Sequence, residues 1–170
     1  MKRFVILFAL LLGVAFVAGA RGKGGDFVKG NSLVNANLGL KYIVVPNFGV
    51  SYEYCVASGF FSSGRGSLGV GGYLGTTFGA LYAVNTRVTL HNQFDNLDFY
   101  VGALNGVNFI RIPKTILTEE AAMVPYYGFD VFLGFRWAFT ENWGMNLELA
   151  PIPAGTFTLP FWSVGGSFRF

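Results

Sequence analysis

The chain has 170 residues, of which 52% are hydrophobic, 18% are aromatic and only 12% are charged. The charged share is well below the roughly 25% usual in soluble domains, and a single cysteine excludes an internal disulfide. The formal net charge is +3, but Lys2 and Arg3 supply two of these charges, so the rest of the chain has no basic stripe that would bind nucleic acid.

The first twenty residues have the three parts of a secretory signal peptide. Met1-Lys2-Arg3 is basic, residues 4–17 carry no charged or strongly polar side chain, and Ala18-Gly19-Ala20 ends as such leaders end. The alternative, an uncleaved anchor helix, is disfavoured because the apolar part is shorter than the ~20 residues that span a bilayer. We therefore predict a signal peptide over residues 1–20, cleaved near Ala20.

After a short, glycine-rich and irregular segment over residues 21–30, apolar and polar residues alternate with a period of two. One row of each alternating segment holds large apolar side chains, and the other holds mostly Gly, Ser, Asn or charged residues. The third segment is the weakest and the sixth is the clearest, although Phe132 places one large apolar residue on its polar row. The eight segments cover residues 34–41, 48–57, 67–75, 82–91, 98–109, 127–139, 143–149 and 162–170.

A period of two over segments of about ten residues is typical of strands in a membrane barrel. No apolar run after Val17 approaches the length of a spanning helix, and a closed barrel is the other structure that satisfies its backbone within lipid. The pattern therefore predicts a single all-β domain over residues 31–170. We expect an eight-stranded antiparallel up-and-down transmembrane β-barrel.

The connections between these segments differ in length. Asp95-Asn96 and Glu141-Asn142 predict tight turns. Two longer, proline-bearing connections over residues 111–125 and 151–160 are expected to make any extracellular contacts. The connection over residues 57–66 is long for a turn between adjacent strands, whereas residues 77–80 make a short connection.

The apolar row is assigned to the outside because eight strands of large side chains would overfill the interior of so small a barrel. The opposite row carries four basic and four acidic residues, for which we predict an ion-pair network in the lumen without a wide channel. These residues are Lys41, Glu53, Arg87, Asp98, Asp130, Arg136, Glu148 and Arg169. Aromatic residues near strand ends predict a girdle at the membrane–water interface. They are Tyr82, Trp137, Trp143 and Trp162.

The sequence contains no pattern that predicts a catalytic, cofactor-binding or metal site. His91 is the only histidine, and without a neighbouring base–nucleophile pair it is interpreted as a polar lumen residue. Cys55 is interpreted as a buried thiol, and one cysteine with one distant histidine does not make a zinc site. Pairing with arginines accounts for the acidic residues, which would otherwise suggest glycosidic chemistry.

Residues from Asn31 to Phe170 resemble the small eight-stranded outer-membrane barrels of the OmpX/OmpA type, also grouped as a porin family. The stretches that carry the resemblance are FGVSYEY over 48–54, LDFYVG over 97–102, FTENWGMNLEL over 139–149 and the closing VGGSFRF over 164–170. The resemblance implies location in the outer membrane of a Gram-negative bacterium, in contact with its lipids. It also implies that the barrel-assembly machinery recognises the last strand through Trp162, Phe168 and Phe170.

The expected function is that of a non-enzymatic integral outer-membrane protein with a structural or surface-interaction role. A narrow channel and a subunit of a larger envelope complex, with envelope proteins as partners, remain open. A lipid-A-modifying enzyme, a secreted lipocalin-like carrier and a soluble sandwich with an aromatic core are the weaker alternatives. No cofactor and no nucleic-acid partner are expected.

Overall fold

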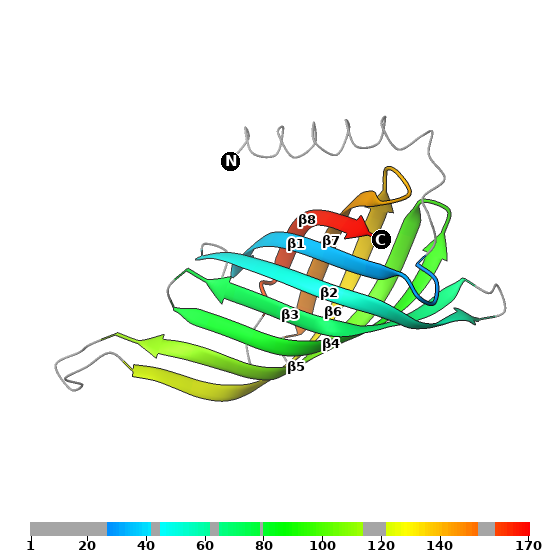
Figure 1. Ribbon diagram of the computed structural model, residues 1–170. Coiled ribbons are helices and arrows are strands. Elements are labelled where there is room, and N and C mark those ends of the chain that lie inside the picture. The colour runs from blue at the N-terminus through cyan, green and yellow to red at the C-terminus, as the bar shows by residue number, and fades with distance from the viewer. Residues whose placement is uncertain (1–26, 42–44, 62–64, 79, 114–121, 153–158) are drawn as a thin grey trace, which may run out of the picture.

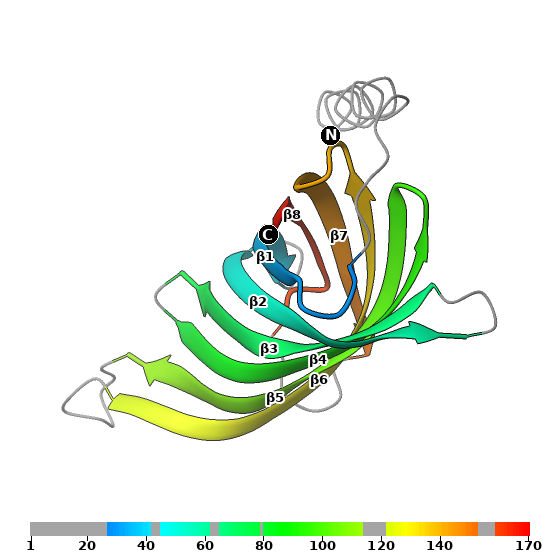
Figure 2. The ribbon, with the colours of Figure 1, turned by 45° about the vertical axis from the view of Figure 1, so that its right-hand side comes forward.

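The fold comes from a computed structural model, which describes residues 27–41, 45–61, 65–78, 80–113, 122–152 and 159–170. Each strand pairs antiparallel with the next, and β8 pairs back onto β1, so the ring closes in sequence order (Figures 1 and 2). The eight-stranded antiparallel up-and-down barrel is therefore confirmed. The strands are β1 (Ser32–Lys41), β2 (Val45–Phe60), β3 (Gly66–Thr77), β4 (Leu81–Phe94), β5 (Leu97–Ile112), β6 (Ala122–Ala138), β7 (Trp143–Ile152) and β8 (Trp162–Arg169).

Strand β4 shows how the sequence pattern sorts side chains between the two faces of the wall. Its odd-numbered residues are buried, whereas its even-numbered residues up to Leu90 are exposed. Successive side chains of a strand point to opposite faces, so the odd row faces the interior. Large apolar residues are exposed all around the ring, and they include Leu38, Phe48, Leu74, Val84, Val88, Phe99, Tyr127 and Leu133.

Strand β2 is longer than the alternation predicts. It continues to Phe60, with irregular pairing to β3 between Cys55 and Ala57 and again between Ser58 and Phe60. A bulge adds an unpaired residue and shifts the row by one, so the period of two ends before the strand does. The expectation of a long connection over residues 57–66 is therefore wrong, because only residues 61–65 join the two strands.

The two long proline-bearing connections are also shorter than expected. β5 runs to Ile112 and β6 begins at Ala122, so Pro125 lies inside a strand, opposite Phe109. Proline is tolerated where its nitrogen does not face a paired neighbour, and among the described residues β6 pairs with β7 only from Val131 onward. The β5–β6 hairpin projects at the end of the barrel away from the C-terminus (Figure 1).

Several sequence predictions fall on residues that the structure does not describe. The signal peptide over residues 1–20 lies outside the described residues, as does the segment over 21–30 apart from its last four residues. Strand β7 extends to Ile152, and residues 153–158 of the predicted 151–160 connection are also not described. No helix that is long and apolar enough to cross a membrane occurs in the described part of the chain.

Candidate functional site

The inward-facing rows bring five of the eight predicted charges together inside the barrel. Arg87 lies at the centre of one half of the cluster. Its Nε donates to Glu53 Oε1 at 2.9 Å, and its Nη2 and Nη1 donate to the two carboxylate oxygens of Glu148 at 2.6 and 3.4 Å. The side chains of Arg87 and Glu53 are 0% exposed. Two-point contact between a guanidinium and a carboxylate fixes the relative orientation of the two groups in addition to pairing their charges.

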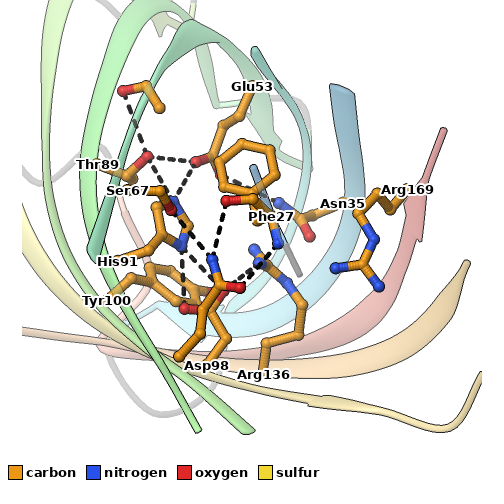
Figure 3. Close-up of polar contacts among 12 residues, drawn as sticks. Phe27, Asn35, Glu53, Ser67, Thr89, His91, Asp98, Tyr100, Arg136 and Arg169 are labelled. Carbon is orange, nitrogen blue, oxygen red and sulfur yellow. Dashed lines mark hydrogen bonds and ion pairs between the residues drawn. The ribbon is translucent and has the colours of Figure 1, made fainter. Parts of the chain in front are cut away.

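His91 joins this half of the cluster to a second one (Figure 3). Its Nε2 lies 3.1 Å from Glu53 Oε2, and its Nδ1 lies 2.9 Å from Asp98 Oδ2. Arg136 Nη1 donates to the same Asp98 oxygen at 2.5 Å. Both ring nitrogens of His91 thus face carboxylate oxygens, and both can donate only in the imidazolium form. In that form the six groups sum to zero charge, which is the condition for burying them together.

Aromatic rings complete the surroundings of the two guanidinium groups. The Arg87 guanidinium lies over the Phe132 ring at 4.1 Å, and that of Arg136 lies over the Tyr100 ring at 4.9 Å. Tyr100 also donates its hydroxyl to Glu148 Oε1 at 3.0 Å. A cation over an aromatic face is attracted by the ring quadrupole, more so away from water. Phe132, the apolar exception on the polar row of its strand, therefore packs against a charge.

Thr89 was not identified from the sequence, although it lies on the same inward row as Arg87 and His91. Its Oγ1 lies 3.0 Å from His91 Nε2, so Thr89, His91 and Asp98 have the connectivity of a nucleophile, a base and an orienting acid. The hydroxyl, however, donates its single proton to Glu53 Oε2, so towards a donating His91 Nε2 it is an acceptor and not an activated nucleophile. The spacing Thr89-x-His91 is the one signal that could have indicated this contact.

Packed atoms surround the Thr89 hydroxyl on the side of Gly69. A Cβ added at Gly69 would lie only 2.6 Å from Thr89 Oγ1 and 3.0 Å from Glu53 Oε2. Thr89, His91 and Glu53 are all fully buried, so the arrangement is a packed hydrogen-bond network. Across the described ranges, no group of three or more His, Cys, Asp and Glu side chains is arranged to hold a metal ion.

The other three predicted charges have different surroundings. Asp130 is buried, and its Oδ2 accepts a hydrogen bond from the Leu159 backbone at 3.2 Å. Arg169 is only half-buried and donates through Nε and Nη2 to the carbonyl of Glu141, in the turn between β6 and β7. The side chain of Lys41 lies outside the described residues.

Asparagines occupy much of the remaining inward surface. Asn146 donates to Asn37 Oδ1 at 2.9 Å, and Asn85 donates to Asn108 Oδ1 at 3.4 Å. Among the described residues, the buried Oδ1 atoms of Asn35, Asn85 and Asn146 have no protein donor. Buried polar groups of this kind commonly bind ordered water.

The predicted girdle and terminal-strand aromatics lie at strand ends. Trp143 begins β7 and packs against Phe168 with ring centroids 4.6 Å apart, and Phe168 stacks on Phe170 at 5.9 Å. Trp137 lies next to the last residue of β6, on the same side of the barrel. At the opposite end, Tyr82 is the second residue of β4 and Trp162 is the first of β8. Trp143 and Tyr82 are exposed, whereas Trp137 and Trp162 are half-buried.

No family model and no curated protein matches this chain. Among solved structures, a de novo designed transmembrane β-barrel is similar with a TM-score of 0.57 and 13% identity, covering 84% of this chain and 97% of the other. The N-terminal β-barrel domain of Pseudomonas aeruginosa OprF has a TM-score of 0.49, with 14% identity and coverages of 84% and 98%. Neisserial surface protein A has a TM-score of 0.39, with 13% identity and coverages of 82% and 93%. At such low identity the first similarity concerns the fold alone: the chain has the fold of a small transmembrane β-barrel.

Proposed function

We propose that this chain is an integral outer-membrane protein of a Gram-negative bacterium, with a structural or surface-interaction role and a closed interior. The observation that carries the proposal is the reversal of the usual burial pattern. Large apolar side chains such as Leu74, Val88 and Leu133 are exposed, whereas Glu53, Arg87 and Glu148 are buried. Soluble proteins rarely bury charges or expose a contiguous apolar belt, but a barrel in lipid does both.

The charge cluster supports a closed interior. Around the ring, β7 is three strands away from both β2 and β4, so the bonds from Arg87 to Glu148 cross the lumen. The interior of an eight-stranded barrel is just wide enough to be filled by side chains. Buried ion pairs contribute specificity more than net stability, which suits a scaffold of one fixed shape better than a diffusion pore.

The projecting hairpin supports a surface-interaction role. The ends of β5 and β6 extend past the pair formed by Leu81 and Ile110, where β4 begins. Exposed apolar side chains on this hairpin include Ile112, Met123 and Val124. Exposed apolar residues on a projecting element are typical of contact surfaces, so envelope proteins are the proposed partners. Recognition of Trp162, Phe168 and Phe170 by the assembly machinery is part of the same proposal.

Cell fractionation and gel migration test the membrane location. The full-length chain, expressed in a Gram-negative host, should be recovered in the outer-membrane fraction. It should also migrate faster in unheated than in heated detergent gels, because a folded barrel stays compact until it is boiled. Recovery as a water-soluble protein that needs no detergent would contradict the proposal and favour a secreted carrier.

A narrow channel is the second candidate, because unpaired asparagine oxygens lie along the buried interior. Planar-bilayer recording separates the two candidates. The closed barrel should give no steady conductance, since the ion pairs of Arg87 with its two carboxylates cross the lumen. A steady wild-type conductance that changes on substitution Arg87→Met would favour the channel.

The proposal includes no enzymatic role. Expression of the chain should leave the mass of the host's lipid A unchanged, because the Thr89 hydroxyl is enclosed by packed side chains. Mass spectrometry of lipid A measures this directly. A mass change that disappears in His91→Ala would identify a lipid-modifying enzyme instead.

A further inference from the structure

The residues that precede β1 enter the mouth of the barrel near the C-terminus. Phe27 is only 2% exposed, and its ring lies 4.8 Å from the ring of His91. Gly30 has a positive φ of 99°, and Asn31 donates its backbone N–H to the Val28 carbonyl at 3.0 Å. This turn lets the chain double back from the mouth into the first strand.

Gln93 holds the backbone of Phe27 at both of its polar atoms. The Phe27 N–H donates to Gln93 Oε1 at 2.8 Å, and Gln93 Nε2 donates to the Phe27 carbonyl at 3.0 Å. Gln93 Nε2 also donates to Ser67 Oγ at 3.0 Å, which fixes the amide in place. A side-chain amide that bonds both the N–H and the C=O of one residue acts as an antiparallel strand neighbour would.

Strand β3 leaves room for the ring. A Cβ at Gly69 would lie 3.3 Å from Phe27 Cε1, and on its other side it would meet the hydroxyl of Thr89 and the carboxylate of Glu53. The ring therefore lies directly against the charge cluster (Figure 3). Gln93, which holds the Phe27 backbone, is nearer than His91 to the end of β4, so the ring lies on the mouth side of the cluster. Phe27 also packs with Leu33 and Cys55 in one buried apolar group.

Cys55 lies under the same segment. Its N–H donates to the Asn31 carbonyl at 2.9 Å, its carbonyl accepts from the Gly30 N–H at 3.0 Å, and its Sγ lies 3.7 Å from the Phe27 carbonyl. The thiol is 0% exposed. Because it is the only cysteine of the chain, its reactivity reports whether this segment is in place.

We propose that residues 27–31 are a built-in stopper, with Phe27 as an internal ligand of the barrel mouth and Gln93 as its receptor. In place, the stopper shields His91, Glu53 and Cys55 from water. Released, it leaves a site suited to a peptide group that bears an aromatic side chain. The proposal depends on the barrel fold and goes beyond the outer-membrane role.

Labelling of the native thiol tests the stopper. The full-length chain, extracted in mild detergent, is treated with N-ethylmaleimide, and the fraction alkylated is followed by mass spectrometry. Cys55 in the wild type should react far more slowly than in the urea-unfolded chain. Phe27→Ala should accelerate labelling by at least about tenfold, since thiol labelling follows the open population. Gln93→Met, which keeps the side-chain length but removes both hydrogen bonds to Phe27, should accelerate it by a smaller factor.

The matched control is Val28→Ala, which truncates an exposed side chain of the same segment and should label at the wild-type rate. Heat-modifiable migration of each variant shows that the barrel is still folded, so loss of the stopper is distinguished from loss of the barrel. Wild-type-like labelling of folded Phe27→Ala and Gln93→Met would overturn the proposal. So would equal acceleration by Val28→Ala, or a wild-type thiol that reacts as fast as the unfolded one.

Discussion

Arg87 is the residue on which the interior depends most, because two carboxylates from other strands use it as their counter-charge. Glu53 lies on β2 and Glu148 on β7. Removing one partner of a buried pair leaves the other charge without compensation, which costs more than the intact pair contributes. Here a single substitution would leave Glu148 without its counter-charge and Glu53 with only that of His91.

We expect Arg87→Met to destabilise the folded barrel by ~3–5 kcal/mol, because both carboxylates stay buried without their guanidinium. Urea unfolding in detergent, followed by tryptophan fluorescence, measures the change in the free energy of unfolding. The control is Arg65→Met, whose side chain is exposed and whose loss should cost less than ~1 kcal/mol. Equal stabilities of the two variants would show that Arg87 is not the centre of the network.

The hydroxyl of Thr89 contacts both Glu53 and His91. Thr89→Val keeps the shape and removes the hydroxyl, so it should cost about 1–3 kcal/mol through the unsatisfied partners. Thr86→Val on the exposed face of the same strand should stay within ~0.5 kcal/mol of the wild type. The same urea titration compares them, and a larger loss in Thr86→Val would reverse the assignment of the two faces.

The alternation placed the charged residues on one face of each strand, but it could not select their partners. Arg87 and Glu148 are 61 residues apart in the sequence, and only closure of the ring brings them together. Arg169 shows the same limit, because its position at the end of β8 directs it to the Glu141 carbonyl. Phe27 lies before the periodic region, where no pattern indicates a buried aromatic residue.

At the scale of the strand, glycines on the inward row set how close the network can approach the wall. Gly69 and Gly72 both lie on β3 but on opposite faces. A Cβ at Gly69 would meet Thr89 Oγ1 at 2.6 Å, whereas at Gly72 the nearest atom would be 3.6 Å away. An added side chain at Gly69 would therefore require its neighbours to move, whereas one at Gly72 would not.

We therefore expect Gly69→Ala to destabilise the barrel by ~1–3 kcal/mol through overpacking. Gly72→Ala should be neutral or slightly stabilising, because alanine reduces the conformational entropy of the unfolded chain. The urea concentrations at the unfolding midpoints of both variants, measured in the same detergent, compare their stabilities with that of the wild type. A tolerated Gly69→Ala would mean that Thr89 and Phe27 have free space beside them, against the packing described above.

The alternation of residues within one segment could not predict where each strand ends. In β2, the shifts at Cys55 and Ser58 break the period while pairing with β3 continues to Phe60. In β6, Pro125 indicates a loop by composition, yet it pairs with Phe109 because its nitrogen can face away from β5. Pairing between strands, which a single segment does not encode, decided both cases.

For the whole molecule, the decisive question is the solvent that surrounds the apolar wall. In water, substituting an exposed residue changes stability little, wherever it lies along a strand. In a bilayer the cost of a charge depends on depth and is greatest at the midplane. Val88 and Phe94 share the outward row of β4, one near its middle and one at its end, so they sample two depths on one strand.

We expect Val88→Arg to destabilise the barrel in phosphatidylcholine vesicles by ~2–4 kcal/mol and Phe94→Arg by only ~0–1 kcal/mol, since arginine near the interface stays hydrated. Urea titration of vesicle-folded protein, read by tryptophan fluorescence, gives both values. Val88 is 47% exposed and Phe94 is 40% exposed, so accessibility alone predicts similar effects at the two positions. A larger loss of stability in Val88→Arg would therefore arise from the surrounding lipid. Two small and equal losses would indicate that water surrounds the barrel.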